Sequence, residues 1–307
     1  MAPALQRGQS PVYWFRARAA TVSRASAYLE LTKPRLTLLV LVTTAAGAYL
    51  AASGAVDPWL VARTLLGTWL VASGASALNQ VAERDADARM QRTQARPLPS
   101  GRLQALEALR FGVALSVAGL LLLAVSVNLL ASLLAAATLG LYLFLYTPLK
   151  RRTALCTLIG AVPGAIPPMI GWAAVRGALG VEGWVLFAVL FLWQLPHFLA
   201  IAWLYREDYA RAGFPMLPVI DPDGGSTARQ AVLYAAALVP VSLMPTLLGL
   251  AGSLYFVGAL LLGAAFLAVG SGMLSVRSNE RASRLFLASI AYLPLLLTLM
   301  VCDKVLL

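Results

Sequence analysis

The sequence contains about nine continuously apolar stretches, each long enough to cross the roughly 30 Å hydrocarbon layer of a membrane as a helix. They lie near residues 36–54, 61–78, 106–127, 129–146, 155–175, 184–204, 232–251, 254–274 and 285–302. These stretches do not alternate apolar and polar residues as barrel strands do, so helices are the form that satisfies their backbone groups in lipid. With 60% hydrophobic and only 12% charged residues, the chain has too little polar surface for a soluble domain of 307 residues. We therefore expect an all-α protein in the lipid bilayer, with residues 1–307 forming a single helical bundle.

The net charge of +11 is distributed unevenly between the two sides of the predicted bundle. Most basic residues fall on one side when nine spans are counted: Arg7, Arg16, Arg18, Arg24, Lys33 and Arg35 before the first span, Arg84, Arg89, Arg92, Arg96 and Arg102 after the second, Lys150, Arg151 and Arg152 after the fourth, Arg206, Arg211 and Arg229 after the sixth, and Arg277, Arg281 and Arg284 after the eighth. The opposite side keeps Arg63, Arg176 and Lys304. This positive-inside pattern predicts a basic cytoplasmic arm at residues 1–30, a cytoplasmic N-terminus and an outer C-terminus in the cell's inner (plasma) membrane. The basicity thus indicates orientation in the membrane, and we expect no nucleic acid partner.

A first group of polar residues directly follows the second apolar stretch. Because each helical residue turns by about 100°, Asn79, Glu83 and Asp87 drift by only ~80° and share one helix face, whereas Asp85 points away. Oxygen ligands of this kind suit Mg²⁺, which binds through one or two carboxylates together with substrate phosphates. Arg92 and Arg96 follow within reach of phosphate oxygens. The alternative is a solvated helix end whose charges pair with one another.

A second acidic group, Glu207 and Asp208, follows the sixth apolar stretch on the same side of the membrane. Two acidic groups at one membrane edge predict a two-sided clamp on an anion through Mg²⁺, with Asp208 as a further metal ligand. The alternative is a solvated loop neutralised by neighbouring arginines. His197, the sole histidine, lies two helical turns before Tyr205. A lone histidine in an apolar helix is commonly a structural residue, but here it is also placed to face a cavity below the acidic group.

At these two groups the sequence resembles the UbiA superfamily of membrane-embedded aromatic prenyltransferases. The superfamily's first motif, Asn followed by Asp four and eight residues later, falls on Asn79, Glu83 and Asp87, with Glu in place of the first Asp. Residues 31–35, 90–102, 146–153, 164–172, 193–198 and 208–218 resemble the branch of the superfamily that acts on heme. The second motif departs from the general pattern, since Tyr205 stands where an earlier Asp is expected, and this leaves the second set of metal ligands open. Cys156 and Leu199 also stand where a polar and an aromatic residue are expected.

The resemblance implies transfer of a farnesyl group from farnesyl diphosphate to the 2-vinyl group of heme B, giving heme O and diphosphate, with Mg²⁺ as cofactor. It implies an active site on the cytoplasmic face and a product that passes to a downstream heme A synthase or terminal oxidase. The implied catalytic residues are Asn79, Glu83, Asp87, Glu207 and Asp208, and the implied substrate-binding residues are Lys33, Arg92, Arg96, Lys150, Arg151, His197 and Tyr205.

Two other functional classes remain as alternatives at this point. A related prenyltransferase acting on a quinone or chlorophyll precursor would share the first motif, and the residues around His197 and Asp208 argue against it. A transporter would also be polytopic, but it should carry ionisable groups near the membrane midplane, in related repeats. Here such groups gather at one membrane edge, which favours interfacial chemistry. The two cysteines, Cys156 and Cys302, show no metal-cluster spacing and predict no disulfide.

Overall fold

The computed structural model describes residues 23–305 and is helical throughout its regular elements. Within this part of the chain nine spans are long and apolar enough to cross a membrane, which confirms the all-α prediction. Four spans before residue 205 are single continuous helices: α3 (Pro34–Ala51), α4 (Pro58–Asp87), α5 (Ala105–Ser126) and α10 (Val181–Leu204). Three further continuous spans end the chain: α13 (Gly225–Leu247), α14 (Ser253–Ser275) and α15 (Asn279–Cys302). Residues 1–22 of the basic arm predicted at residues 1–30 lie outside the described part of the chain.

Two spans are interrupted, although the apolar stretches at 129–146 and 155–175 each predict one continuous helix. The fourth span consists of α6 (Leu129–Gly140), a π-helical turn η1 (Leu141–Tyr146) and α7 (Thr147–Leu149). The fifth consists of α8 (Cys156–Ala165) and α9 (Pro167–Arg176), which break at Ile166 because Pro167 and Pro168 supply no backbone donors. Proline breaks and π-turns inside a membrane bundle re-aim side chains toward its interior, and π-turns recur at functional sites.

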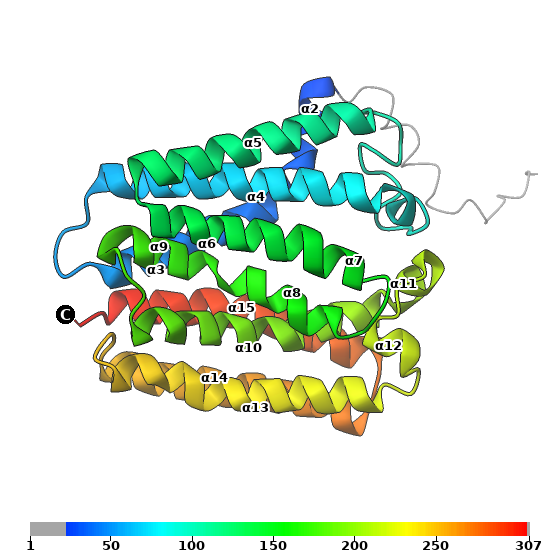
Figure 1. Ribbon diagram of the computed structural model, residues 1–307. Helices are drawn as coiled ribbons and strands as arrows, with labels where there is room; N and C mark the ends of the chain where they lie inside the picture. Colours follow the sequence, from blue (N-terminus) through cyan, green and yellow to red (C-terminus); the bar gives the residue numbers. More distant parts are fainter. Residues whose placement is uncertain (1–22, 306–307) are drawn as a thin grey trace, which may run out of the picture.

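Short helices occupy the connections at one end of the bundle. Helix α2 (Arg24–Leu31) precedes the first span, and α11 (Arg206–Ala212) and α12 (Leu217–Ile220) lie between α10 and α13. Figure 1 shows α11 and α12 beside the end of α7, at the same end of the molecule as the loop after α4. The long connections after α4 and after α10 therefore gather at one end of the bundle.

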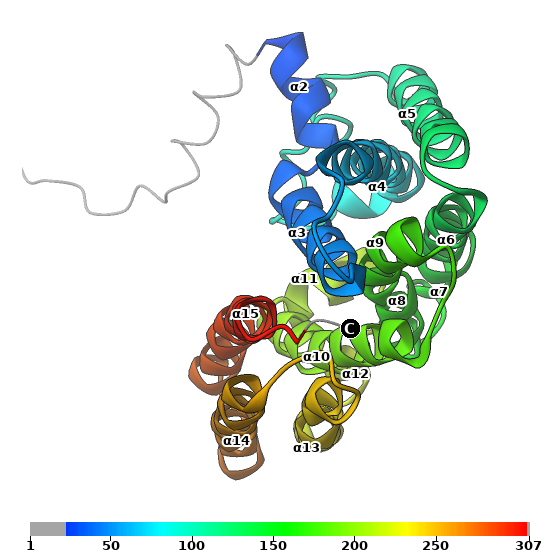
Figure 2. The same ribbon diagram turned by 90° about the vertical axis from the view of Figure 1, so that its left-hand side faces the viewer.

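The spans follow one another round the bundle, and the last returns to the first (Figure 2). Helix α15 contacts α3, and the residues after α15 reinforce this contact. The Lys304 ammonium donates to the carbonyl oxygens of Tyr49 (2.6 Å) and Ala52 (2.7 Å) at the end of α3. It also lies 4.5 Å from the centre of the Tyr49 ring, a cation–π distance. Lys304 thus ties the end of the chain to the first span.

Helices α3 and α9 pack closely because glycine lets their backbones approach. A Cβ built on Gly47 would lie 2.0 Å from the Pro168 carbonyl oxygen, and one built on Gly171 would lie 1.9 Å from the Thr44 carbonyl oxygen. No side chain fits at either position unless the helices separate. Small residues at such crossings are the usual means of helix association in lipid, where the hydrophobic effect does not drive helices together.

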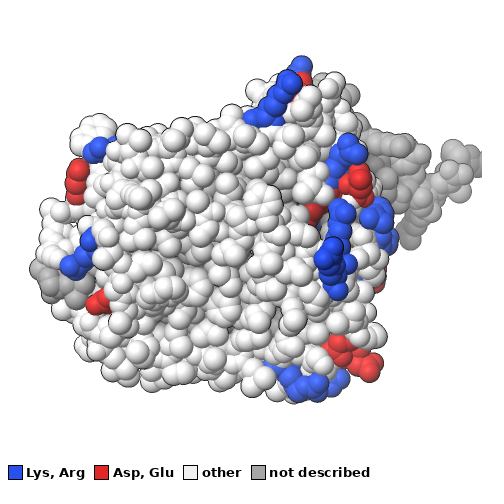
Figure 3. All heavy atoms as spheres, viewed as in Figure 1, with Lys and Arg blue, Asp and Glu red and all other residues white. Residues whose placement is uncertain are grey.

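The surface has an apolar belt with charges at its two ends, most of them at one end (Figure 3). Large apolar side chains point outward on the belt, such as Val125 (84% exposed) and Phe144 (80% exposed). In water such a surface would aggregate, whereas in lipid it is the expected exterior. We call the end that carries α7, α11 and the loop after α4 the site end.

Candidate active site

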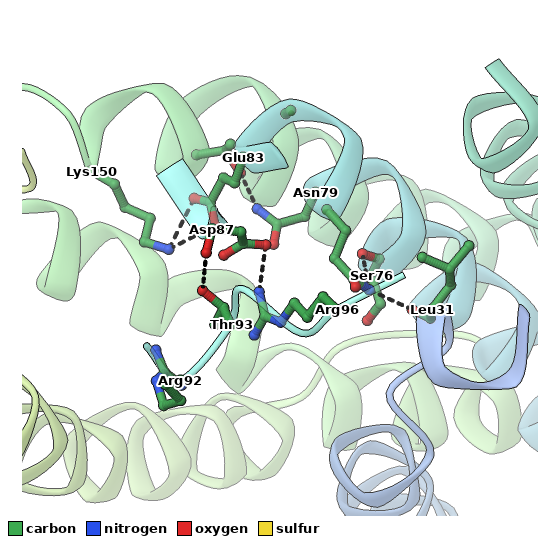
Figure 4. Close-up of polar contacts among 12 residues, drawn as sticks. Leu31, Ser76, Asn79, Glu83, Asp87, Arg92, Thr93, Arg96 and Lys150 are labelled. Atoms are coloured by element: carbon green, nitrogen blue, oxygen red, sulfur yellow. Dashed lines mark hydrogen bonds and ion pairs between the residues drawn. The ribbon is translucent and has the colours of Figure 1, made fainter. Parts of the chain in front are cut away.

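Three polar residues predicted from the sequence lie together on the last two turns of α4. Asn79, Glu83 and Asp87 are 2%, 3% and 0% exposed, and they point toward the same region (Figure 4). Burying two carboxylates is unfavourable by several kcal/mol each unless cations or donors compensate. The structure shows which groups provide this compensation.

Each carboxylate pairs with one cation from a different segment. Lys150 Nζ lies 2.9 Å from Oε1 and 3.0 Å from Oε2 of Glu83, donating to Oε2, and Arg96 donates to Oδ2 of Asp87 at 2.7 Å. Burial alone would lower the pKa of the Lys150 ammonium, but the neighbouring Tyr146 and Glu83 outweigh burial and raise that pKa. Lys150 therefore stays charged, and the cluster is a compensated group of fixed charges.

The neutral member of the cluster is positioned by the π-helical turn. Asn79 Nδ2 donates to Thr147 Oγ1 at 3.0 Å, and Thr147 Oγ1 donates to the Tyr142 carbonyl at 2.8 Å. The Tyr142 carbonyl lies inside η1 and also accepts the backbone N–H of Thr147, five residues later, as in a π-helix. Because the amide nitrogen of Asn79 is used, its oxygen is the atom left for a ligand. Sequence reasoning missed Thr147, although it lies in a segment that carries the family resemblance.

Two buried carboxylate oxygens of the cluster, Glu83 Oε1 and Asp87 Oδ1, accept no hydrogen bond. Glu83 Oε1 does lie 2.9 Å from the Lys150 ammonium, as an ion pair. Among residues 23–305, no group of three or more His, Cys, Asp or Glu side chains lies close enough to form a complete metal cage. Two carboxylates and one amide oxygen, with the rest of the coordination left to water and substrate, match the way Mg²⁺ binds at phosphate-processing sites. The residues present thus fit a divalent ion that is completed by a diphosphate.

The loop after α4 folds over this cluster and brings Arg96 to it. Thr93 Oγ1 donates to the Asp87 carbonyl at 2.8 Å, and the side chains of Met90 and Leu98 are buried beneath the loop. Helix α4 ends at Asp87, so the loop begins ten residues before Pro97. Anchored in this way, the loop places the Arg96 guanidinium against the Asp87 carboxylate, nine residues earlier in the chain.

Lys33 approaches the cluster from the turn between α2 and α3. It is half-buried and lines a cavity of about 420 Å³ with Arg96, Gln80 and Glu30. Burial, together with the positive charges of Arg96 and Lys150, lowers the pKa of the Lys33 ammonium to about 7. Its φ of 48° is the one positive φ of a non-glycine residue between positions 23 and 305. Such strained backbone persists where the surroundings impose it, commonly at functional sites.

The second acidic group is arranged differently from the sequence prediction. Asp208 is buried, and its two oxygens accept hydrogen bonds from the backbone N–H groups of Gln91 (3.1 Å) and Arg92 (3.3 Å). Arg211 also pairs with Asp208. These donors occupy the carboxylate that was expected to bind metal, and Glu207 beside it is exposed to solvent. Asp208 therefore fastens the loop after α4 to α11, and its part as a further metal ligand stays a prediction.

The remaining predicted residues lie at different distances from the cluster. The Arg92 guanidinium lies over the rings of Tyr205 (4.8 Å) and Tyr209 (5.9 Å), so the predicted Arg92 and Tyr205 do meet at the mouth of the site. Arg151 is exposed and donates to the Ala82 carbonyl on α4 at 3.2 Å, outside the cluster. His197 lies deeper, in α10, where its Nδ1 is 2.7 Å from Ser289 Oγ.

A polytopic helical bundle with buried carboxylates and several cations at one end defines a class of protein, the membrane enzymes that process anionic substrates at the edge of the bilayer. The UbiA prenyltransferase family matches residues 40–296, and the chain belongs to that family. It is 54% identical over 286 residues to a protoheme IX farnesyltransferase of Solibacter usitatus, covering 90% of this chain and 98% of that protein. It is 45% identical over 297 residues to a protoheme IX farnesyltransferase of Koribacter versatilis, covering 94% and 96%.

Solved structures share the fold at low sequence identity. A digeranylgeranylglyceryl phosphate synthase superposes with a TM-score of 0.77 at 18% identity, covering 92% of this chain and 99% of that one. A UbiA homolog from Archaeoglobus fulgidus bound to GPP and Mg²⁺ superposes with a TM-score of 0.66 at 16% identity, covering 90% and 99%. These similarities establish the architecture.

Proposed function

We propose that this protein transfers the farnesyl group of farnesyl diphosphate to the 2-vinyl group of heme B, producing heme O and diphosphate. The observation that carries the transferase part is the buried cluster in which Glu83 and Asp87 each pair with one cation and each have one oxygen that accepts no hydrogen bond. The choice of heme as acceptor is supported by the identity to named protoheme IX farnesyltransferases over nearly their full length.

We infer that Asn79, Glu83 and Asp87 hold Mg²⁺ together with the substrate diphosphate. A bound Mg²⁺ would neutralise the diphosphate and favour its departure. The charge of a bound Mg²⁺ would compensate Glu83 and Asp87. Lys150 and Arg96, together with Lys33 and Arg92 at the mouth of the site, would then bind the phosphate oxygens. In this scheme Asp208 holds the loop that carries Arg92 and Arg96.

The proposed reaction consumes one water molecule. The bond between farnesyl C1 and the diphosphate oxygen breaks, and its electron pair leaves with diphosphate, which Lys150 and Arg96 stabilise electrostatically. The terminal vinyl carbon forms a bond to farnesyl C1, the cation then lies on the other vinyl carbon, and water adds there and loses a proton. The bundle interior must keep water away until the carbon–carbon bond exists. The rings of Trp172, Trp193 and Phe198 are proposed to line the apolar region and stabilise the cation.

We propose the cytoplasmic face of the inner membrane as the location of the site end. The support is the excess of Lys and Arg on that end, which the positive-inside rule places in the cytoplasm. The product, a more apolar heme, would be taken up by a downstream heme A synthase or terminal oxidase assembly in the same membrane.

Incubation of the purified protein in lipid nanodiscs with heme B, farnesyl diphosphate and Mg²⁺ tests the proposal, with products identified by mass spectrometry. We expect a heme whose mass has increased by one farnesyl group and one hydroxyl group, and no product when Mg²⁺ is chelated. A parallel reaction with an aromatic quinone precursor serves as the control acceptor. Prenylation of that acceptor together with unmodified heme would refute the proposed function.

A further inference from the structure

The turn between α2 and α3 holds Lys33 in a backbone conformation that the local sequence does not favour. Its φ of 48° and ψ of 61° are left-handed, and in this region the Cβ of a non-glycine residue crowds the backbone. The following Pro34 favours an extended backbone at the residue before it. The conformation of Lys33 is therefore imposed by contacts from outside the turn.

Two buried side chains supply such contacts by donating to carbonyl oxygens beside Lys33. Gln80 of α4 donates through Nε2 to the Leu31 carbonyl at 2.9 Å, and Thr37 of α3 donates through Oγ1 to the Thr32 carbonyl at 2.7 Å. Gln80 and Thr37 are only 1% and 2% exposed. Because the last carbonyls of a helix have no donors within that helix, these two side chains complete the end of α2.

Gln80 also connects this turn to the carboxylate cluster. It directly follows Asn79, and since one residue along a helix turns by about 100°, a single turn of α4 directs Asn79 toward the cluster and Gln80 toward the end of α2. Figure 4 shows Leu31 beside this turn of α4. Gln80, Lys33 and Arg96 line one cavity of about 420 Å³. Helix α4 thereby fixes the position of Lys33 relative to the cluster.

We propose that Gln80 is a positioning residue for the diphosphate of the prenyl donor, and that it acts through the backbone of Lys33. Its bond to Leu31 holds the turn, and the turn holds the Lys33 side chain in the cavity beside Arg96. A diphosphate that contacts both a metal ion and a lysine needs the two at a fixed separation, which α4 supplies. The inference rests on the proposed function, which makes a diphosphate the ligand of the cluster. Without the Gln80 donor, Lys33 relaxes toward the extended backbone that Pro34 favours, and its ammonium leaves the cavity.

A double-mutant cycle between Gln80 and Lys33 tests this inference, with the binding of farnesyl diphosphate to the protein in nanodiscs measured by calorimetry. Gln80→Met keeps the length of the side chain and removes the donor, and Lys33→Met removes the ammonium. We expect each single variant to bind about tenfold more weakly, and the double variant to stay within about twofold of Lys33→Met, because both changes remove the same interaction. Thr64→Val removes a buried hydroxyl-to-carbonyl bond near the other end of α4, and this control should change the affinity by less than about twofold.

Independent effects of the two substitutions, with a loss of about a hundredfold in the double variant, would overturn the inference. So would the disappearance, in Gln80→Met, of the gain in affinity that Mg²⁺ confers, because the substitution would then act through the neighbouring Asn79. Should Gln80→Met not fold, Thr37→Val removes the other donor to the turn and should couple to Lys33→Met in the same way. Failure of the proposed function is distinct, since it would appear as absence of farnesylated heme while Gln80 and Lys33 still act together in diphosphate binding.

Discussion

At the residue scale, each buried carboxylate of the site is paired with one cation. Lys150 and Arg96 offset the cost of burying Glu83 and Asp87, and these cations come from segments 67 and nine residues away in the sequence. Asp87 Oδ1, which accepts no hydrogen bond, and Glu83 Oε1, which is paired with Lys150, are the oxygens proposed to bind a divalent ion. The cluster is therefore stable without a ligand and still able to bind one.

Asp87→Asn should abolish most of the activity while leaving the fold intact. The amide keeps the shape and can still accept from Arg96, but it removes the charge that binds the metal, and loss of one such electrostatic group lowers turnover by about 10²–10³-fold. The measurement is farnesyl transfer at saturating substrate, with thermal stability in nanodiscs as the check on folding. Asp85→Asn is the matched control, because Asp85 is exposed and pairs with Arg84 on the outer surface. Activity of Asp87→Asn within about threefold of wild type would remove Asp87 from the metal site.

Lys33 should make the binding of farnesyl diphosphate depend on pH. Its pKa is about 7 in the protein without ligand, and a bound anion raises that pKa, so binding is strongest where Lys33 is already protonated. Affinity should be full below pH 7 and should weaken as pH rises through 7, by at most about tenfold per unit, until the pKa of the complex is reached. Titrations above about pH 7 avoid the last phosphate ionisation near pH 6.

Lys33→Arg provides the control for this pH dependence. Arginine keeps its charge throughout the range, so the affinity of this variant should be flat between about pH 7 and pH 9. A slope equal to that of the wild type would assign the titration to another group.

At the element scale, the connection after α4 and the connection after α10 form one assembly over the site. Asp208 of α11 caps the N–H groups of Gln91 and Arg92, and the Arg92 guanidinium packs on Tyr205 and Tyr209. The connection after α4 and the connection after α10 thereby hold each other, although more than 100 residues separate them in the sequence. This arrangement explains how a loop rich in arginine stays ordered at a membrane edge.

Asp208→Ala should loosen the loop after α4 without changing the metal requirement. Charge-assisted hydrogen bonds contribute about 1.5–3 kcal/mol each, so losing those of Asp208 should speed tryptic cleavage at the loop arginines by at least tenfold. The Mg²⁺ concentration that gives half-maximal activity should shift by less than about twofold, because the proposed metal ligands are Asn79, Glu83 and Asp87. Glu207→Gln, on the exposed neighbour, should alter neither quantity. A tenfold shift of the Mg²⁺ midpoint in Asp208→Ala, with unchanged proteolysis, would return Asp208 to the metal ligands.

The sequence predicts the spans and the first acidic group well for one physical reason. Both depend on local periodicity: continuous apolar runs must be helices in lipid, and residues four apart on a helix share a face. The break at Ile166 and the π-turn before Thr147 depend on how neighbouring helices pack, and Asp208 and Ser289 acquire their partners from distant segments. Periodicity along one helix contains no information about such partners. The local indication that Ser289 has a polar partner is its position as a polar residue within the apolar run of α15.

At the scale of the whole molecule, orientation connects the charge distribution to the proposed function. Nine spans place the loop after α4 and the connection between α3 and α4 on opposite sides of the membrane. Farnesyl diphosphate is water-soluble and anionic at its reactive end, so the site end must face the compartment that supplies it. The positive-inside rule predicts that this compartment is the cytoplasm, and this prediction can be tested independently of enzymatic activity.

Single cysteines on the two sides should be labelled oppositely by a membrane-impermeant maleimide. Ser53 and Ser100 are both exposed, the first just after α3 and the second in the loop after α4. In a Cys302→Ser background, which removes the exposed native thiol, Ser53→Cys should react in intact spheroplasts and Ser100→Cys only after lysis. The buried Cys156 supplies the internal control, since it should stay unlabelled in both conditions until the protein is denatured. The reverse pattern would place the carboxylate cluster outside the cytoplasm, and because farnesyl diphosphate does not cross lipid unaided, the proposed reaction would then lack its donor.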